Sequence, residues 1–352
     1  MNKSQANSTK ELDTSKIMLP IFIGAAVLIY FIFSKIDWQE FTQIAWNANM
    51  VFWVGIATFF LVLRHLAYAL RLRILSQGVF SWIKSIQLIF IWEFSSAVSP
   101  TAVGGSAAAL FVLSREKLSA ARVTAIILYT AILDTIFFIG TLPILYFLYG
   151  ASIIRPGLTD FAHLDTWGKS FVFAYFFMAL YGLFFFYGLF IKPEGLKRIA
   201  LWVTDFRLFK RWQTRANKLG DDFITASAEM ANNGFSFGLK AFLATATAWS
   251  SRFILLNCLI IGFQQDIPTD LFTQGALYAR LETMFVIMAF SPTPGSAGVA
   301  EILFHDFVLD YISSETTSSI VAILWRLMTY YLYIFVGALI IPAWIRSLVK
   351  KR

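Results

Sequence analysis

Long apolar runs separated by short polar segments dominate the chain. A helix needs roughly 20 apolar residues to cross the ~30 Å hydrocarbon core of a bilayer. Runs of this length occur six times, each ending at charged or turn-forming residues, and we predict a membrane-spanning helix for each. They cover residues 17–34, 51–70, 121–149, 171–191, 239–262 and 320–341. The pattern predicts an all-α polytopic membrane protein.

Two further apolar segments, 84–113 and 271–304, are too long for one simple helix. Each contains the same triplet near its middle, Ser99-Pro100-Thr101 in the first and Ser291-Pro292-Thr293 in the second, followed by glycines and small residues. Proline removes a backbone donor and glycine permits positive φ, so neither segment can form an uninterrupted helix. We therefore expect two hairpin tips, one at Pro100, Gly104 and Gly105 and one at Pro292, Pro294, Gly295 and Gly298.

The charges of the flanking loops indicate how these two segments are threaded. Lys and Arg accumulate in the cytoplasmic loops of membrane proteins. The first broken segment lies between two basic loops, 71–85 and 114–122, whereas the second lies between two acidic loops, 263–270 and 305–319. Each segment is therefore predicted to enter and leave the membrane on one face, as a re-entrant hairpin.

The order span, hairpin, span then occurs twice, in residues 51–149 and 239–341, with opposite orientation. This is the pattern of an inverted repeat, in which broken helices from the two halves meet near the bilayer midplane at a substrate site. The same charge rule places the N-terminus and the C-terminus in the cytoplasm. Unpaired N–H groups at the broken helix ends would favour an anion there.

Around the membrane domain, assigned to 17–345, lie a polar leader at 1–16 and a basic tail at 346–352. Within it, the basic segment 193–238 predicts an amphipathic helix on the cytoplasmic surface, because aromatic residues recur there near helical spacing among Lys and Arg. The aromatic residues are Trp202, Phe206, Phe209 and Trp212. The segment either binds anionic lipid head groups or is a solvated linker.

Composition agrees with this picture and excludes several classes of function. Hydrophobic residues make up 58% of the chain and charged residues 14%, against roughly a quarter charged in soluble proteins. The net charge of +8 lies in short runs between spans, so we expect no nucleic acid partner. Cys258 is the one cysteine, which rules out an intrachain disulfide. His65, His163 and His305 are scattered, so we expect no metal, no cofactor and no catalytic residue.

Ionisable residues inside membrane segments are costly and usually face a cavity or a partner. We therefore take seven of them as candidates for a lipid head-group site or cavity: Arg252, Arg280, Arg326, Glu93, Asp134, Glu282 and Glu301. The planar fork of arginine fits phosphate oxygens. Arg64 is placed near a cytoplasmic end, where its charged group can reach the surface, and Arg71 in the loop beyond it. Alternatively, all these charges are internal ion pairs that fix the bundle.

Two motifs resemble those of a known family, the flippase-like membrane domain of lysylphosphatidylglycerol synthases. One is Pro292-x-Pro294-Gly295-x-x-Gly298-x-x-Glu301 with Arg326 about a span later, and the looser one is Pro100-x-x-x-Gly104-Gly105 with Asp134 in the next span. The likeness covers about 17–345. Where the family often continues with glutamate and with a second glycine, this chain has Ser106 and Ser296.

The resemblance implies movement of a lipid between leaflets of a bacterial cytoplasmic membrane, in the best-known members an aminoacylated phosphatidylglycerol. The substrate could equally be another phospholipid or a lipid-linked precursor such as a polyprenyl-linked sugar. The arginines favour anionic membrane lipids as partners. The aminoacyl-transferase domain of the synthases is missing from this sequence, so the resemblance does not imply lysyl transfer. A separate lipid-modifying enzyme and a homo-oligomer stay open as partners. Two other functions also stay open: an enzyme or glycosyltransferase accessory acting on lipid-linked substrates, and a secondary transporter of a small solute.

Overall fold

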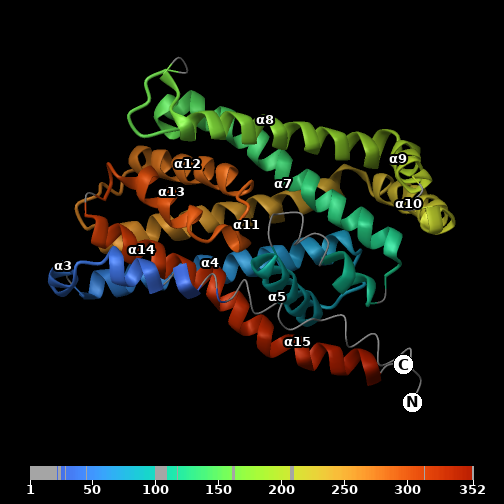
Figure 1. Cartoon of the computed structure of the whole chain (residues 1–352), viewed down its shortest axis with the longest axis horizontal. Coiled ribbons are helices and arrows are strands. Elements are labelled where there is room, and N and C mark those ends of the chain that lie inside the picture. The colour runs from blue at the N-terminus through green and yellow to red at the C-terminus, as the bar shows by residue number, and fades with distance from the viewer. Residues whose placement is uncertain are drawn as a thin grey trace.

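The structure is a computed structural model that describes residues 22, 25–27, 29–44, 46–99, 109–116, 118–160, 163–206, 210–312 and 314–350. In these ranges the chain consists of α-helices joined by short 3-10 and π turns, without a β-strand (Figure 1). The prediction of an all-α polytopic membrane protein is confirmed.

Five helices in the described residues are long and apolar enough to cross a bilayer, and they confirm five of the predicted spans. The first four are α4 (Ala48–Leu75), α7 (Ala120–Tyr149), α8 (Thr166–Phe186) with its π turn η3 (Tyr187–Ile191), and α11 (Gly234–Phe263). The fifth joins α14 (Glu315–Arg326), the π turn η6 (Leu327–Tyr331) and α15 (Leu332–Lys350). Of the first predicted span, 17–34, the structure describes part of a short apolar helix, Ala25–Ser34.

Polar residues at the predicted loop boundaries start these helices. The side chains of Asn47, Ser119, Asp165 and Ser314 each accept a hydrogen bond from a backbone N–H in the first turn of α4, α7, α8 and α14, respectively. Such N-caps satisfy donors that have no partner within the helix. Each span therefore begins where the sequence changes from polar to apolar.

The second broken segment is a helical hairpin, as the sequence predicts. Its arms, α12 (Leu271–Met288) and α13 (Val299–Val308), pack against each other and are joined by residues 289–298, which include the 3-10 turn η5 (Pro294–Ser296). In the first broken segment, α5 (Trp82–Val98) ends just before the Ser-Pro-Thr proline, and residues 109–114 are helical again. The predicted tip at Pro100, Gly104 and Gly105 lies outside the described residues.

The two halves pack in a reciprocal way. α4 and α11 lie side by side along most of their length (Figure 1). α5 of the first half packs against α15 of the second, and α12 of the second packs against α7 of the first. The first arm of each hairpin, α5 or α12, thus contacts the last span of the other half, which is the arrangement expected of an inverted repeat.

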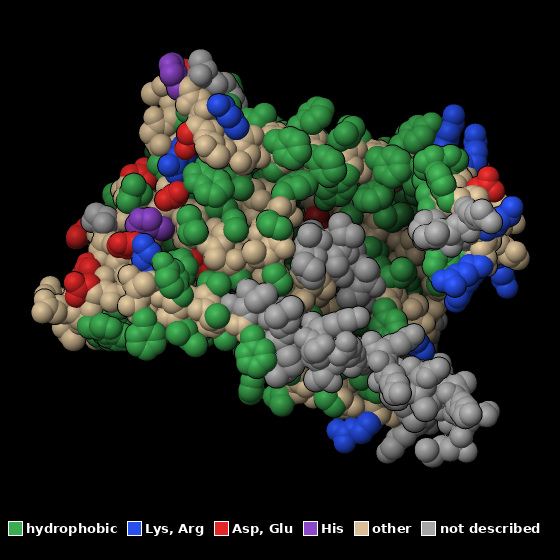
Figure 2. Space-filling model, viewed as in Figure 1, with side chains coloured by type: hydrophobic (Ala, Val, Ile, Leu, Met, Phe, Trp, Pro, Cys, Tyr) green, Lys and Arg blue, Asp and Glu red, His purple; other side chains and the backbone are tan. Residues whose placement is uncertain are grey.

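Charged side chains gather at opposite ends of the helices (Figure 2). Lys and Arg cluster over α9 (Pro193–Asp205) and α10 (Gln213–Ala231), whereas Asp and Glu lie around α3 (Trp38–Gln43) and the outer ends of α12, α13 and α14. Apolar side chains cover the face between the two ends, notably along α8. The belt of apolar surface is the part that would contact lipid.

The single amphipathic helix predicted within 193–238 is instead two helices. α9 ends at Asp205, and α10 returns alongside it, where the Lys197 Nζ bonds Asp221 Oδ1 at 2.6 Å. A Cβ on Gly220 would lie 2.4 Å from the Lys197 stem, so the glycine lets the two helices approach. Trp202 and Phe206 stay exposed on the outer face, as an amphipathic surface helix requires.

Candidate functional site

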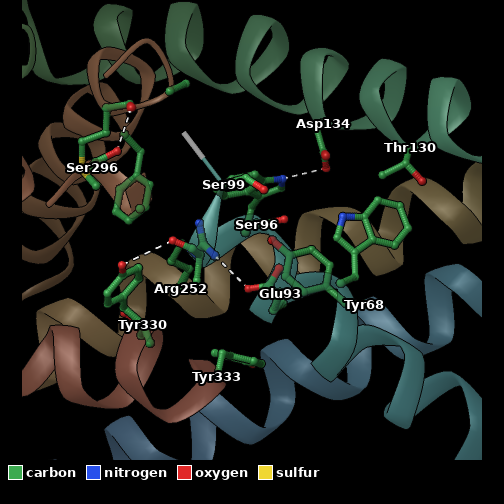
Figure 3. Close-up of a pocket in the computed structure, with 18 of the residues that line it drawn as sticks. Tyr68, Glu93, Ser96, Ser99, Thr130, Asp134, Arg252, Ser296, Tyr330 and Tyr333 are labelled. Atoms are coloured by element: carbon green, nitrogen blue, oxygen red, sulfur yellow. Dashed lines mark hydrogen bonds and ion pairs between the residues drawn. The ribbon is translucent and has the colours of Figure 1, made fainter. Parts of the chain in front are cut away.

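The two hairpins meet at a central cavity of about 400 Å³ (Figure 3). Its wall includes Ser96 and Ser99 from the first broken segment and Ser291, Thr293 and Ser296 from the second. The described parts of both Ser-Pro-Thr regions thus line one space, and Tyr330 Oη donates a hydrogen bond to the Ala97 carbonyl at 3.3 Å beside it. Helices α4, α7, α8, α11, α12, α14 and α15 and the π turn η6 supply the rest of the wall.

Hydroxyl groups satisfy the broken backbone of the second tip. The Thr293 hydroxyl donates to the Ala297 carbonyl at 2.9 Å, and the Ser296 hydroxyl donates to the Met288 carbonyl at 3.0 Å. The Thr293 and Ser291 hydroxyls are also bonded to each other at 3.0 Å. These short polar side chains replace hydrogen bonds that a continuous helix would have made.

Two glycines of this tip have backbone conformations that other residues rarely adopt. Gly295 has φ +55°, and a Cβ there would lie 2.0 Å from Cε2 of Tyr330. Gly298 has φ +83° but no atom within 4 Å of a Cβ position. Gly295 is therefore required for conformation and for space, whereas Gly298 is required for conformation alone.

One carboxylate in the cavity lies between two arginines. Glu93 of α5 accepts a hydrogen bond from the buried Arg64 of α4, and Arg252 Nη2 of α11 approaches the same Oε2 at 3.8 Å. Arg252 lies over the rings of Trp249 and Phe285, with its Cζ 4.8 and 5.1 Å from the ring centroids. The carboxylate is committed to Arg64, so Arg252 keeps donor capacity toward the cavity.

The structure corrects two sequence assignments in α4, which continues to Leu75. Arg64 is fully buried and does not extend to the surface. Arg71 lies within the helix, lines the cavity and bonds Asp134 Oδ1 at 2.5 Å. Both guanidinium groups lie near the Tyr68 ring, which shares their helix face. The spacing of seven residues between the two arginines places them on one face of a helix and could have revealed the pair.

Arg326 ends α14 where the π turn begins. Its Nε lies 3.1 Å from Glu301 Oε1 of α13, and its Cζ lies 4.1 Å from the Tyr330 ring centroid. Its buried Nη2 has no hydrogen-bond partner among the described residues. The other Glu301 oxygen accepts from the Gly298 N–H at 2.7 Å and so caps α13. π turns often occur at functional sites, and this one directs Arg326 and Tyr330 into the cavity wall.

Arginines outnumber carboxylates in this region of the described chain. Four arginines and three carboxylates contact one another or the cavity: Arg64, Arg71, Arg252, Arg326, Glu93, Asp134 and Glu301. Of the seven sequence candidates, five therefore come together here. Arg280 and Glu282 do not line the cavity: Arg280 pairs with Asp310 beyond α13, and Glu282 contacts Thr141 of α7.

Aromatic rings close the cavity on the side of the acidic end. Toward this end, the last residues that line the cavity are Phe138 on α7, Arg252 on α11 and Phe285 on α12. At this level Phe138 packs edge-on against Trp249, and Phe285 against Phe253, with centroid distances of 4.7 and 5.3 Å. In the other direction the lining reaches Leu72 and Ile127, toward the basic end.

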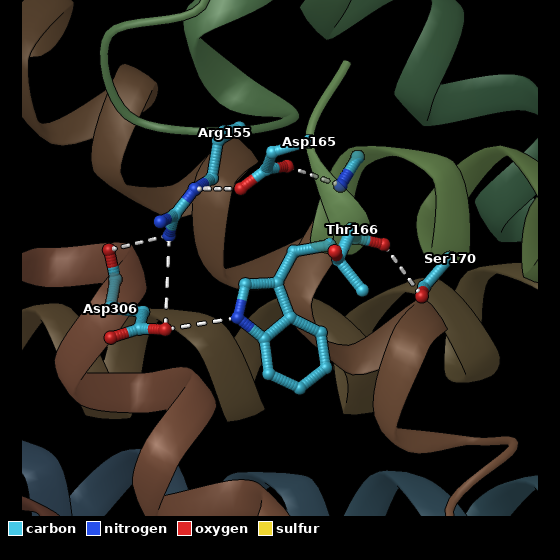
Figure 4. A network of polar contacts seen from close by, with 7 residues as sticks. Arg155, Asp165, Thr166, Ser170 and Asp306 are labelled. Atoms are coloured by element: carbon cyan, nitrogen blue, oxygen red, sulfur yellow. Dashed lines mark hydrogen bonds and ion pairs between the residues drawn. The ribbon is translucent and has the colours of Figure 1, made fainter.

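A polar network lies at the acidic end and ties the segment between α7 and α8 to the hairpin (Figure 4). Arg155 Nε bonds Asp165 Oδ2 at 2.8 Å, and its Nη1 lies 3.9 Å from Asp306 Oδ2 of α13. The Trp167 Nε1–H donates to the same carboxylate oxygen at 2.9 Å. This network links α13 of the second hairpin to the first turn of α8.

Comparison with known proteins places the chain in a family. The model of the lysylphosphatidylglycerol synthase transmembrane region matches residues 17–337. The chain belongs to this family. It is therefore a membrane protein with a lipid-related function. A UPF0104 membrane protein of Archaeoglobus fulgidus is 23% identical over 340 residues, covering 93% of this chain and 94% of that protein. No solved structure matches the chain significantly.

Proposed function

We propose that the protein moves a lipid between the two leaflets by passing its phosphate-bearing head group through the central cavity. The excess of arginine over carboxylate among the described residues carries this proposal. A buried cation without a counter-ion is costly, so the cavity favours an anionic ligand. Arg252 is the best placed to receive it, because its neighbouring carboxylate already bonds Arg64. Arginine also matches phosphate oxygens with two parallel hydrogen bonds.

The size and chemistry of the cavity favour a head group over a whole lipid. A volume of about 400 Å³ falls in the range of roughly 300–1,000 Å³ of small-ligand pockets. Arginines, carboxylates and hydroxyls line it, so acyl chains gain nothing by leaving the bilayer for this space. The tails are therefore proposed to stay in the lipid while the head group crosses.

The cavity is proposed to face the cytoplasm in this conformation. It extends toward the end that carries α9 and α10, and basic ends of membrane proteins are cytoplasmic. The aromatic closure formed by Phe138, Trp249 and Phe285 then separates it from the opposite leaflet. Translocation would require α12 to separate from α7 at this closure.

The test is lipid movement in proteoliposomes containing a fluorescent anionic or zwitterionic phospholipid, followed with a quencher that does not cross the membrane. We compare the wild type with Arg252→Lys, which keeps the charge but loses the planar fork. One hydrogen bond to a charged group contributes about 1.5–3 kcal/mol, so the rate at low lipid concentration should fall about 10- to 100-fold.

Arg280→Lys is the matched control, because Arg280 is a paired arginine on a neighbouring helix, more buried than Arg252, that does not line the cavity. It should retain the wild-type rate. Equal losses in both variants would show that the arginines act only through stability. A wild type that moves no lipid but accumulates a labelled solute, or converts a lipid-linked substrate, would replace the proposal with one of those functions.

A further inference from the structure

Glu282 is a fully buried carboxyl group that the cavity does not use. It lies on α12 three residues before Phe285, about 4.5 Å along the helix axis beyond the aromatic closure. Its Oε1 contacts the Thr141 hydroxyl of α7, and its Oε2 has no hydrogen-bond partner in the described structure. Glu282 and Thr141 thus lie directly on the α7–α12 contact that closes the cavity.

The geometry at Thr141 assigns a proton to Glu282. The Thr141 oxygen lies 2.7 Å from the Phe137 carbonyl, in the usual bond of a helical threonine to the residue four positions earlier. A hydroxyl has one hydrogen to donate, and a carbonyl can only accept. If Thr141 donates to Phe137, the bond between Thr141 and Glu282 needs its hydrogen from Glu282. Both contacts are satisfied together only when Glu282 is the neutral acid.

Among the described residues, the surroundings of Glu282 contain no cation that would stabilise its ionised form. Tyr278, on α12 itself, bonds Ser250 of α11 at 3.0 Å, and Tyr175 of α8 donates to the Ile139 carbonyl at 3.2 Å. The adjoining turn η1 (Ala151–Ile153) has no titratable residue.

On the other helices that pack against α12, the charged residues inside the bundle are paired with groups other than Glu282, whereas Lys169 of α8 and Lys240 of α11 are exposed. The paired ones are Asp134 with Arg71, Arg252 with Glu93, Glu301 with Arg326, Asp306 with Arg155 and Trp167, and His305 with Ser318. Arg280, two residues from Glu282, pairs with Asp310. The carboxyl therefore has no counter-ion in the part of the chain that the structure describes, and burial of an unpaired carboxylate is strongly unfavourable.

We propose that Glu282 is a proton-binding site that couples protonation to opening of the α7–α12 contact. When the helices separate, water reaches the carboxyl, the O–H bond breaks, and the proton passes to water on the side of the acidic end. The carboxylate is then stable only in the open form. Closure requires the proton to return and re-form the O–H bond that donates to Thr141.

This inference rests on the proposed function in one respect: separation of α7 from α12 is taken as the step that lets a head group pass. Its test does not measure lipid movement. The first measurement is infrared spectroscopy of the purified protein at neutral pH. The wild type should show the C=O stretch of a neutral carboxylic acid, shifted in heavy water, and Glu282→Gln should lose it. Glu194→Gln, at an exposed glutamate of α9, should keep it.

The second measurement is the labelling rate of Leu145→Cys, one helical turn beyond Thr141, by a water-soluble thiol reagent in a Cys258→Ala background. Rates are divided by those of an exposed control, Gln265→Cys, to cancel thiol ionisation. Opening that releases one proton should raise this ratio up to about tenfold per pH unit, and Glu282→Gln should abolish the dependence.

Absence of the neutral-acid band, or the same pH dependence in Glu282→Gln and wild type, would overturn the inference. If Glu282→Gln does not fold, Thr141→Val gives a second test, because valine keeps the shape of threonine but cannot accept the hydrogen bond from Glu282. The neutral-acid band should then move to the position of a free carboxylic acid, and an unchanged band would contradict the assignment. If the wild type moves no lipid, the proposed function fails. The infrared band and the labelling ratio still decide whether Glu282 binds a proton.

Discussion

Three glycine-to-alanine substitutions distinguish two reasons for glycine at the second hairpin tip: a positive φ and a lack of space for a Cβ. Gly140 lies on an exposed face of α7 with ordinary helical backbone and open space around its Cβ position. Gly298 has a positive φ with open space, and Gly295 has a positive φ and the Tyr330 ring in the way. The series therefore adds one unfavourable feature at a time.

The expected free energies of unfolding follow from these features. Alanine in place of a helical glycine stabilises by roughly 0.5–1 kcal/mol, so Gly140→Ala should be neutral or slightly stabilising. A left-handed conformation costs a residue with a Cβ roughly 1–2 kcal/mol, which is the loss expected for Gly298→Ala. Gly295→Ala adds an overpacking cost of typically 1–3 kcal/mol, giving a loss of about 2–5 kcal/mol.

The assay is thermal unfolding in detergent, with lipid movement measured on the same preparations. A double variant, Gly295→Ala with Tyr330→Ala, removes the obstructing ring. The double variant should lose about 1–3 kcal/mol less free energy of unfolding than the sum of the two single losses, because the effects of substitutions at contacting residues are not additive. If Gly295→Ala unfolds no earlier than Gly298→Ala, or if the double variant is simply additive, the close approach of the tip to Tyr330 is refuted.

Two further predictions concern the ion pairs and the topology. Arg326→Ala should lower the free energy of unfolding by about 3–5 kcal/mol, because it leaves Glu301 buried without its cation. Arg326→Lys should unfold near the wild-type temperature. Equal losses in the two variants would contradict this prediction. Single cysteines at Ser119 and Gln265, with Cys258 replaced, should react from opposite sides of the membrane with an impermeant thiol reagent, and reaction of both from one side would refute the predicted orientation.

Hydropathy was sufficient to predict five spans, because membrane helices must be long, apolar and internally hydrogen-bonded. The proline and glycine residues of the second Ser-Pro-Thr region predicted the break between α12 and α13. The described part of the first predicted span, Ala25–Ser34, is also helical. Helix ends were less predictable. The basic charge of Arg71 suggested a loop, but its pairing with Asp134 permits α4 to continue through it. Charge pattern cannot distinguish a surface arginine from one that is neutralised across the bundle.

The sequence also could not predict which charged side chains pair with each other across neighbouring helices. Arg280 and Glu282 are two residues apart on α12, so the sequence indicates that they do not face each other, but it does not identify the partner of either. In the structure Arg280 pairs with Asp310, whereas Glu282 has, among the described residues, only the Thr141 hydroxyl as a partner. Residues two apart on a helix point in different directions, so their surroundings depend on which helices pack there. That information lies in the tertiary arrangement.

The second hairpin already contains the anion that a broken helix end would attract. The Glu301 carboxylate caps the N-terminus of α13 through the Gly298 N–H and pairs with Arg326, so it occupies the position expected for a ligand phosphate. The tip hydroxyls are also bonded within the tip. Helix ends therefore contribute little free capacity for a head group here, contrary to the expectation from the Ser-Pro-Thr motif. Under the proposed function, binding then depends on Arg252, whose one nearby carboxylate in the described part of the chain, Glu93, is shared with Arg64. A substitution at Arg252 should consequently impair lipid movement more than the same substitution at Arg326, whose main partner is internal.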